Sequence, residues 1–172
     1  MRCLVIGNAG GGKSTLARRL AARRTLPWVE LDRLLWREGW RAVPTAEAGA
    51  SIDAALAGET WVADGLGHPD ALGARLGRAT HAVLVDLPPW RHFALAARRD
   101  AAWRAGALDH PPAGQASPPS IERLFEMMWH VETRWMDRVR RLVDERERAG
   151  AEVVRVRDLE ALDAAQAGLW PA

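Results

Sequence analysis

The chain has 172 residues, of which 48% are apolar and 27% are charged, a composition typical of one globular domain with its own core. Its only cysteine, Cys3, excludes a disulfide framework, and its apolar runs are too short for a membrane span or a secretion signal. The formal net charge is only +2, and the sequence has no helix-turn-helix signature and no concentrated basic stripe, so DNA is an unlikely partner. We expect a single cytoplasmic domain over 1–172, a monomer or weak dimer.

Short apolar runs alternate with helical patterns along the whole chain. Strands are predicted at 2–6, 28–31, 61–63, 82–85 and 152–156. Helices are predicted at 14–24, 45–56, 69–76, 90–105, 121–148 and 159–167. Strands separated by helices indicate an α/β fold whose parallel sheet carries helices on both faces.

One segment lacks any periodicity. The stretch 107–120 reads ALDHPPAGQASPPS and holds four of the ten prolines, which is typical of a loop rather than a packed element. We therefore predict a small lid over about 105–120.

The first strand runs into the sequence GNAGGGKST, which matches the phosphate-binding pattern G-x-x-x-x-G-K-[ST]. Its glycines let backbone N–H groups turn inward around phosphates, and the following helix adds the positive end of its dipole. Lys13 is the only lysine among 24 basic side chains, so this position requires a slim point charge. The predicted nucleotide-binding residues are Gly7, Asn8, Ala9, Gly10, Gly11, Gly12, Lys13, Ser14 and Thr15.

Three predicted strands end at aspartates, on the sheet edge where ligands of such folds bind. We expect Asp64 to bind Mg²⁺ together with Ser14 and to line the substrate site, although it could instead cap the next helix. Asp32 is expected to contact substrate in a pocket walled by Trp36 and Trp40, although both tryptophans could be ordinary core or surface residues. Asp86 precedes two prolines and is expected to organise a turn.

Arginines beside the predicted lid are candidates for stabilising the charge of a phosphoryl group in transfer. Arg98 and Arg99 precede the proline-rich segment, and Arg134 lies in the helix that follows it. The five histidines have no metal-site spacing, so we expect them at the surface or at helix ends.

The chain resembles the adenylate-kinase-like P-loop proteins, and among them the small DNA topology modulation proteins. The resemblance rests on GNAGGGKST, LDRLLW, WVADG and VDLPP, in this order. It implies a P-loop NTPase fold with five parallel strands in the order 2-3-1-4-5, ATP and Mg²⁺ as ligands, and an acceptor site between Asp32 and the lid. It also implies that adenine lies near Arg157 and Asp158.

The sequence departs from that family at the site expected to hold the acceptor. Adenylate kinases proper follow the third-strand Asp-Gly with Phe-Pro-Arg, whereas this chain continues with Leu66, Gly67 and His68. The arginine that grips a nucleoside monophosphate is therefore missing, and Arg75 is the nearest substitute.

Together these features predict an ATP-dependent phosphotransferase that moves the γ-phosphoryl of ATP to a small molecule near Asp32, Trp36 and Arg75. A hydroxyl acceptor suits Asp32, which could orient or deprotonate it. Three alternatives stay open: a nucleoside monophosphate kinase, a nucleotide-binding regulatory protein linked to DNA topology, and an ATPase switch without an acceptor.

Overall fold

A computed structural model describes residues 1–112 and 114–168 of the chain. Position 113 of the predicted lid and positions 169–172 of the predicted domain lie outside the described residues.

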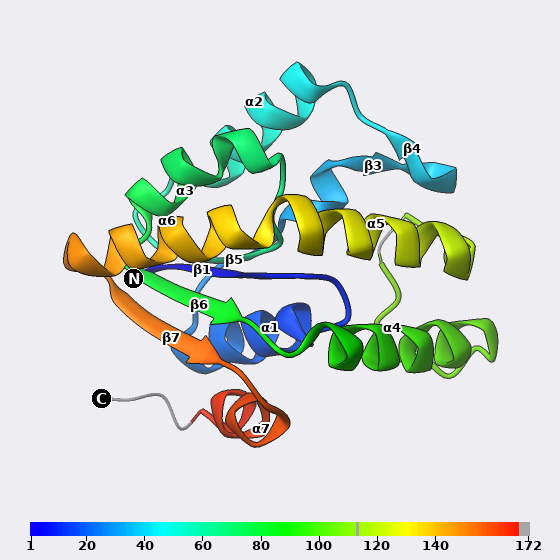
Figure 1. Ribbon diagram of the computed structural model, residues 1–172. Helices are drawn as coiled ribbons and strands as arrows, with labels where there is room; N and C mark the ends of the chain where they lie inside the picture. Colours follow the sequence, from blue (N-terminus) through cyan, green and yellow to red (C-terminus); the bar gives the residue numbers. More distant parts are fainter. Residues whose placement is uncertain (113, 169–172) are drawn as a thin grey trace.

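The centre of the fold is a five-stranded parallel sheet (Figure 1). Its strands are β1 (Arg2–Gly7), β2 (Trp28–Glu30), β5 (Trp61–Asp64), β6 (His81–Val85) and β7 (Glu152–Val156). They lie in the order β2-β5-β1-β6-β7, which confirms the predicted order 2-3-1-4-5. The central strand β1 is buried almost throughout, as its continuous apolar run predicts for a strand covered on both faces.

Helices cover both faces of the sheet, as Figure 1 shows. They are α1 (Lys13–Arg24), α2 (Thr45–Ala55), α3 (Leu72–Arg78), α4 (Pro89–Arg104), α5 (Ile121–Arg134), α6 (Met136–Arg148) and α7 (Leu159–Ala167). Because side chains alternate along a strand, Cys3 and Val5 of β1 pack on the side of α1 and α7, whereas Leu4 and Ile6 pack on the side of α2, α3 and α6.

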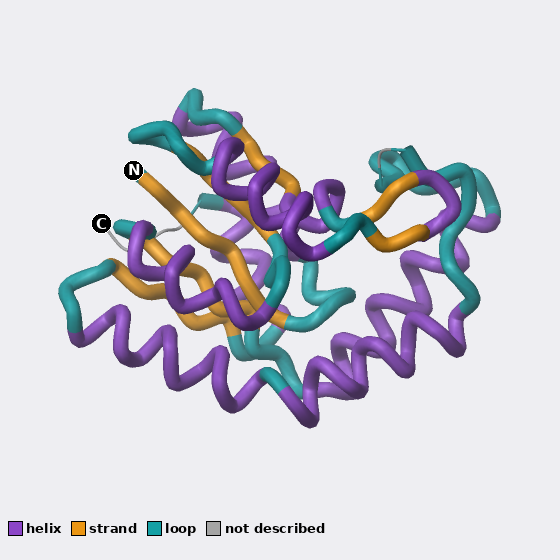
Figure 2. Tube along the Cα trace, turned by 90° about the horizontal axis from the view of Figure 1, so that it is seen from above, coloured by secondary structure: helices purple, strands orange, loops and turns teal. Residues whose placement is uncertain are grey.

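The helix predicted at 121–148 is broken at Trp135, whose φ of −121° and ψ of −32° depart from helical values. On one side of this residue, α6 buries Val139 and Val143 against the sheet. On the other side, α5 leaves the sheet and packs on α4, where the rings of Phe93 and Phe125 lie 4.9 Å apart. The prediction of one long helix was wrong because the two halves pack on different partners, and Figure 2 shows the resulting change of direction.

A small antiparallel hairpin, absent from the predicted elements, lies outside the main sheet (Figure 2). It consists of β3 (Trp36–Arg37) and β4 (Arg41–Ala42), and a 3₁₀ turn at Leu31–Leu34 leads into it from β2. Gly39 and Trp40 between its strands have positive φ of 71° and 58°. Strands of two residues carry no periodic signal, which is why the sequence did not reveal them.

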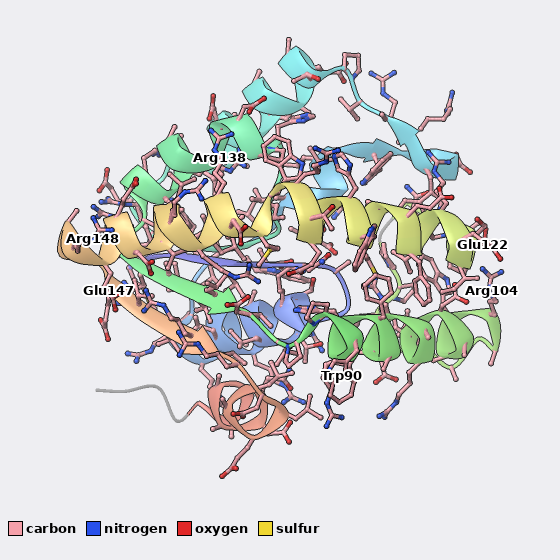
Figure 3. All side chains as sticks on the ribbon, in the orientation of Figure 1. Trp90, Arg104, Glu122, Arg138, Glu147 and Arg148 are labelled. Carbon is pink, nitrogen blue, oxygen red and sulfur yellow. The ribbon has the colours of Figure 1, made fainter. Side chains whose placement is uncertain are left out.

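The charged end of α6 points outward, with Glu147 and Arg148 visible at the surface (Figure 3). Among the described residues, no helix is both long and apolar enough to cross a membrane.

Candidate functional site

The phosphate loop joins β1 to α1 through glycines that the local geometry requires. Gly7 has a φ of +142°, and a Cβ there would lie 2.2 Å from the carbonyl oxygen of Val85 on the neighbouring strand. Gly12, with a φ of +75°, precedes the first residue of α1 and has no side chain that could cap the helix. The first turn carries no acidic residue, so its N–H groups suit an anion.

Lys13 lies inside this loop and is only 8% exposed. Its Nζ donates a hydrogen bond of 2.7 Å to the carbonyl oxygen of Asn8. Burial lowers the pKa of Lys13, while the nearby carboxylates of Asp32 and Asp64 act in the opposite direction. The ammonium group is thus held within the loop, where the sequence pattern predicted a phosphate contact.

Asp64 is buried at the end of β5, and its carboxylate accepts two hydrogen bonds. Its Oδ1 accepts from Ser14 Oγ at 2.8 Å, and its Oδ2 accepts from Trp28 Nε1 at 2.6 Å. Burial raises the pKa of Asp64, and these hydrogen bonds partly counteract that rise. Asp64 does not cap the next helical segment, which begins at Pro69 after His68.

The residues around Ser14 fit Mg²⁺ in the manner of nucleotide-binding sites. In the described part of the chain, no cluster of three His, Cys, Asp or Glu side chains forms a complete metal site. Mg²⁺ that accompanies a nucleotide needs only one or two protein ligands, because phosphate oxygens and water supply the others. The neighbouring oxygens of Ser14 and Asp64, 2.8 Å apart, meet that need.

Asp32 lies in the 3₁₀ turn after β2, and its side chain is exposed to the cavity that the phosphate loop also lines. Although this carboxylate is accessible, the enclosing protein raises its pKa, with Lys13 and Arg99 acting against that rise. It lies close against Gly65, where a Cβ would be 2.8 Å from Asp32 Oδ1. The glycine after Asp64 therefore makes room for the second aspartate.

A cavity of about 480 Å³ extends from the phosphate loop to the predicted lid. Its far wall contains Trp36, Trp40 and Trp103, and the ring of Trp40 lies 6.1 Å from each of the other two, edge to face. The predicted pocket tryptophans thus line the cavity together with Trp103 of α4, which the sequence analysis did not select.

The predicted lid segment is joined to the β3–β4 hairpin by residues that include Trp40 and Gln115 of the cavity lining. The Gln115 side chain accepts a hydrogen bond from the backbone N–H of Trp40 at 3.1 Å and donates one to the carbonyl of Arg37 at 2.9 Å. The indole Nε1 of Trp40 donates to the carbonyl of Ser117 at 2.9 Å. We call these three hydrogen bonds the lid latch.

The cavity brings together some of the predicted arginines and not others. Arg99 lines it, as do Arg33 and Arg123, which the sequence analysis did not select. Three predicted site residues are exposed and lie outside the cavity lining, namely Arg98, Arg134 and Arg157. The arginines of the cavity lining therefore come from the 3₁₀ turn, α4 and α5, and Lys13 of α1 adds a fourth cation.

Arg75 is 4% exposed and does not line the cavity, in contrast to its predicted contact with substrate. Its guanidinium donates to the carbonyl oxygens of Leu66 and His68, the latter at 2.7 Å. Arg75 thus holds the turn after β5, and a Cβ on Gly67 would lie only 3.0 Å from it. Asp158, expected near adenine, caps α7 by accepting from Ala161 N at 2.7 Å.

His92 was expected at the surface or at a helix end; it lies near the start of α4, but it is buried and not at the surface. It is 1% exposed, and its Nδ1 lies 3.0 Å from the carbonyl oxygen of Ala9 in the phosphate loop. Burial and the charge of Lys13 lower the pKa of His92, which favours a neutral ring that donates to this carbonyl. No local pattern marks such a contact between residues 83 positions apart.

Comparisons with known proteins agree with this architecture. The crystal structure of shikimate kinase from Bacteroides thetaiotaomicron resembles this chain with a TM-score of 0.50, over 98% of this chain and 96% of that one, at 14% sequence identity. No protein-family model matches the sequence, and neither does any curated protein. At this identity the likeness establishes the fold: the chain has the α/β P-loop fold that shikimate kinase also has.

Proposed function

We propose that the protein is an ATP-dependent phosphotransferase that moves the γ-phosphoryl group of ATP to a hydroxyl of a small molecule. The observation that carries this proposal is that Lys13 and Asp32 line the same cavity. A phosphate donor site and a carboxylate suited to a hydroxyl thus open into one enclosed space. The fold shared with a shikimate kinase supports the class of reaction, and the residues of the cavity support the type of acceptor.

The phosphate loop would hold the donor through backbone N–H groups and the Lys13 ammonium. Ser14 and Asp64 would hold Mg²⁺, which supplies charge neutralisation of the phosphate oxygens when it is bound. In the transfer, the acceptor oxygen forms a bond to the γ-phosphorus while the bond from that phosphorus to the β-bridging oxygen breaks. Asp32 accepts the hydroxyl proton, a role that its raised pKa favours.

Arg99 and Arg123 would stabilise the charge on the moving phosphoryl group. They line the cavity from α4 and α5, on either side of the predicted lid. The predicted lid has no arginine of its own, so these flanking helices are the natural source.

The tryptophan wall and the lid latch favour transfer to an acceptor over hydrolysis. Trp36, Trp40 and Trp103 present apolar surface, and the latch joins the lid to the hairpin at the same side of the cavity as Trp40. A closed apolar enclosure excludes water from the reacting group. We therefore rank an ATPase switch below a kinase.

A nucleoside monophosphate remains the second candidate acceptor, because two observations favour it. Arg33 and Arg123 supply cations that the missing Phe-Pro-Arg motif does not, and the tryptophans offer faces on which a base can stack. A role linked to DNA topology gains no specific support from the residues of the cavity.

A direct test measures ADP release with Mg²⁺·ATP and a panel of hydroxyl compounds and nucleoside monophosphates. We expect turnover on a hydroxyl compound, and its loss in Lys13→Met and Asp32→Asn. The control Asp163→Asn changes an exposed aspartate of α7 and should keep full activity. Turnover on monophosphates alone would favour the second candidate, and hydrolysis unaffected by any acceptor would refute phosphoryl transfer.

A further inference from the structure

Asn8, the second residue of the phosphate loop, attaches that loop to helix α5. Its side chain is 1% exposed, and its Nδ2 donates to the carbonyl oxygen of Met128 at 2.9 Å and to Glu132 Oε2 at 3.2 Å. Its Oδ1 accepts from the backbone N–H of Ala9 at 2.8 Å. All three polar positions of the amide are thus engaged between the loop and one helix.

The two carboxylate oxygens of Glu132 bind different parts of the protein, one the phosphate loop and the other Arg140 of α6. While Oε2 accepts from Asn8, Oε1 accepts from Arg140 Nη2 at 3.1 Å. Arg140 in turn binds Asp86 at the end of β6 through both Nε and Nη2, at 2.8 to 3.2 Å. Asp86, expected to organise a turn, therefore anchors a network that begins in the phosphate loop.

The two carboxylates of the network are largely shielded from water, while Arg140 between them is 35% exposed. The Glu132 side chain is 13% exposed and that of Asp86 is 17% exposed, whereas an exposed ion pair contributes little. A buried carboxylate that loses one partner retains its desolvation cost, so each member strongly constrains the others.

The same helix forms a wall of the acceptor cavity with its other face. Arg123, Met127 and His130 of α5 line the cavity, while Met128 and Glu132 are the residues bound to Asn8. The backbone carbonyl oxygen of Asn8 also accepts a hydrogen bond from the Lys13 ammonium group. One residue therefore contacts both the lysine expected to bind phosphate and the helix that covers the acceptor.

We propose that Asn8 and Glu132 are positioning residues that couple the phosphate loop to α5, so that nucleotide binding and the placement of α5 over the cavity stabilise each other. The inference rests on the proposed nucleotide site and extends it. By linkage, a nucleotide that orders the loop orders α5, and an α5 held in place raises nucleotide affinity equally. The bend at Trp135 lets α5 follow the loop while α6 stays packed on the sheet.

The test uses the full chain with Asn8→Ala and Glu132→Gln. Asn8→Ala removes both hydrogen bonds that the Asn8 side chain donates to α5. Glu132→Gln keeps the shape of the side chain but leaves a single oxygen, which can serve Asn8 or Arg140 and not both. The matched control is Glu126→Gln, an exposed position on the same helix.

Calorimetry with Mg²⁺·ADP should give affinities about three- to tenfold weaker for both variants and unchanged for the control. The losses in the double variant should fall short of the product of the single losses, because both changes break one network. Hydrogen exchange should show that nucleotide protects the amides of 123–131 in the parent and fails to do so in the variants. A merely structural role would loosen α5 equally with and without nucleotide.

Parental affinity and parental protection of α5 in both variants would overturn the coupling. Should Asn8→Ala fail to fold, Glu132→Gln decides the question alone. A parent that binds Mg²⁺·ADP and shows the coupling, yet phosphorylates nothing, would refute the proposed function and leave this inference standing. A parent without nucleotide affinity would overturn both.

Discussion

The indole Nε1 of Trp28 donates a hydrogen bond of 2.6 Å to Asp64 Oδ2. This leaves Asp64 Oδ1 beside Ser14, at the place where the two residues together suit Mg²⁺. An aromatic residue at the start of β2 thus orients the aspartate at the end of β5.

Trp28→Phe should weaken Mg²⁺-dependent nucleotide binding and shift its pH dependence. The hydrogen bond from Trp28 lowers the pKa of Asp64, so its loss raises that pKa further. Asp64 then takes up its proton at a higher pH, and the acid limb of binding moves upward. Calorimetry with Mg²⁺·ADP between pH 5 and about pH 8 measures this limb. Trp129→Phe, which changes a tryptophan 59% exposed on α5, serves as the control, and identical profiles for both variants would contradict the role.

Gly65→Ala should lower both stability and activity. Gly65 has a φ of +110°, which costs an alanine about 1–3 kcal/mol, and its new Cβ would displace the Asp32 carboxylate. Thermal unfolding and turnover measure the two effects. Gly77→Ala is a matched control within α3, where a Cβ meets nothing within 4 Å, so it should stabilise by about 0.5–1 kcal/mol. Equal behaviour of the two variants would refute the requirement for glycine at position 65.

Asp32→Asn should lower activity about 10²- to 10⁴-fold and raise stability at neutral pH. The folded protein raises the pKa of Asp32, so the folded state disfavours the ionised form. Stability from this group is complete below the unfolded pKa of about 4 and is lost as the pH rises through the folded pKa. Urea unfolding at pH 4 and at about pH 8 should therefore show a gain for the variant only at the higher pH. A loss of stability at the higher pH would contradict the assigned direction.

Gln115→Ala should raise the KM for the acceptor several-fold and increase hydrolysis without an acceptor. The substitution removes two of the three hydrogen bonds of the lid latch, so water enters the cavity more easily. Steady-state kinetics with and without acceptor separate the two effects. Ser117→Ala is the control, because Ser117 takes part only through its backbone carbonyl. Unchanged KM and hydrolysis in Gln115→Ala would show that the latch does not close the site.

The sequence was sufficient for the parts of the molecule that carry a local signal. Alternating strands and helices predicted a parallel sheet covered on both faces, and the spacing of Gly7, Gly12 and Lys13 predicted the phosphate loop. The order of the strands came from the family resemblance and not from the alternation. The sequence analysis did not predict the break at Trp135, because the helical pattern continues on both sides of this residue. The contact of Asn8 with Glu132 joins residues 124 positions apart, and no spacing rule connects such residues.

Arginine was the least predictable residue of the candidate site. Because 23 of the 24 basic residues are arginines, composition alone gives no means to distinguish a cavity cation from a structural one. Arg75 is turned inward and donates to carbonyl groups of the turn at 66–68, whereas Arg123 lines the cavity from α5.

The bend at Trp135 also makes the number of residues between α5, which lines the cavity, and α6, which packs on the sheet, critical. Each helical residue turns the following side chains by about 100°, so one deleted residue at the bend would rotate α5 by more than a quarter of a revolution relative to α6. Met128 would then leave Asn8 while Val139 kept its place in the core. This junction can accept a change of side chain, but an insertion or deletion there would put the two helices out of phase.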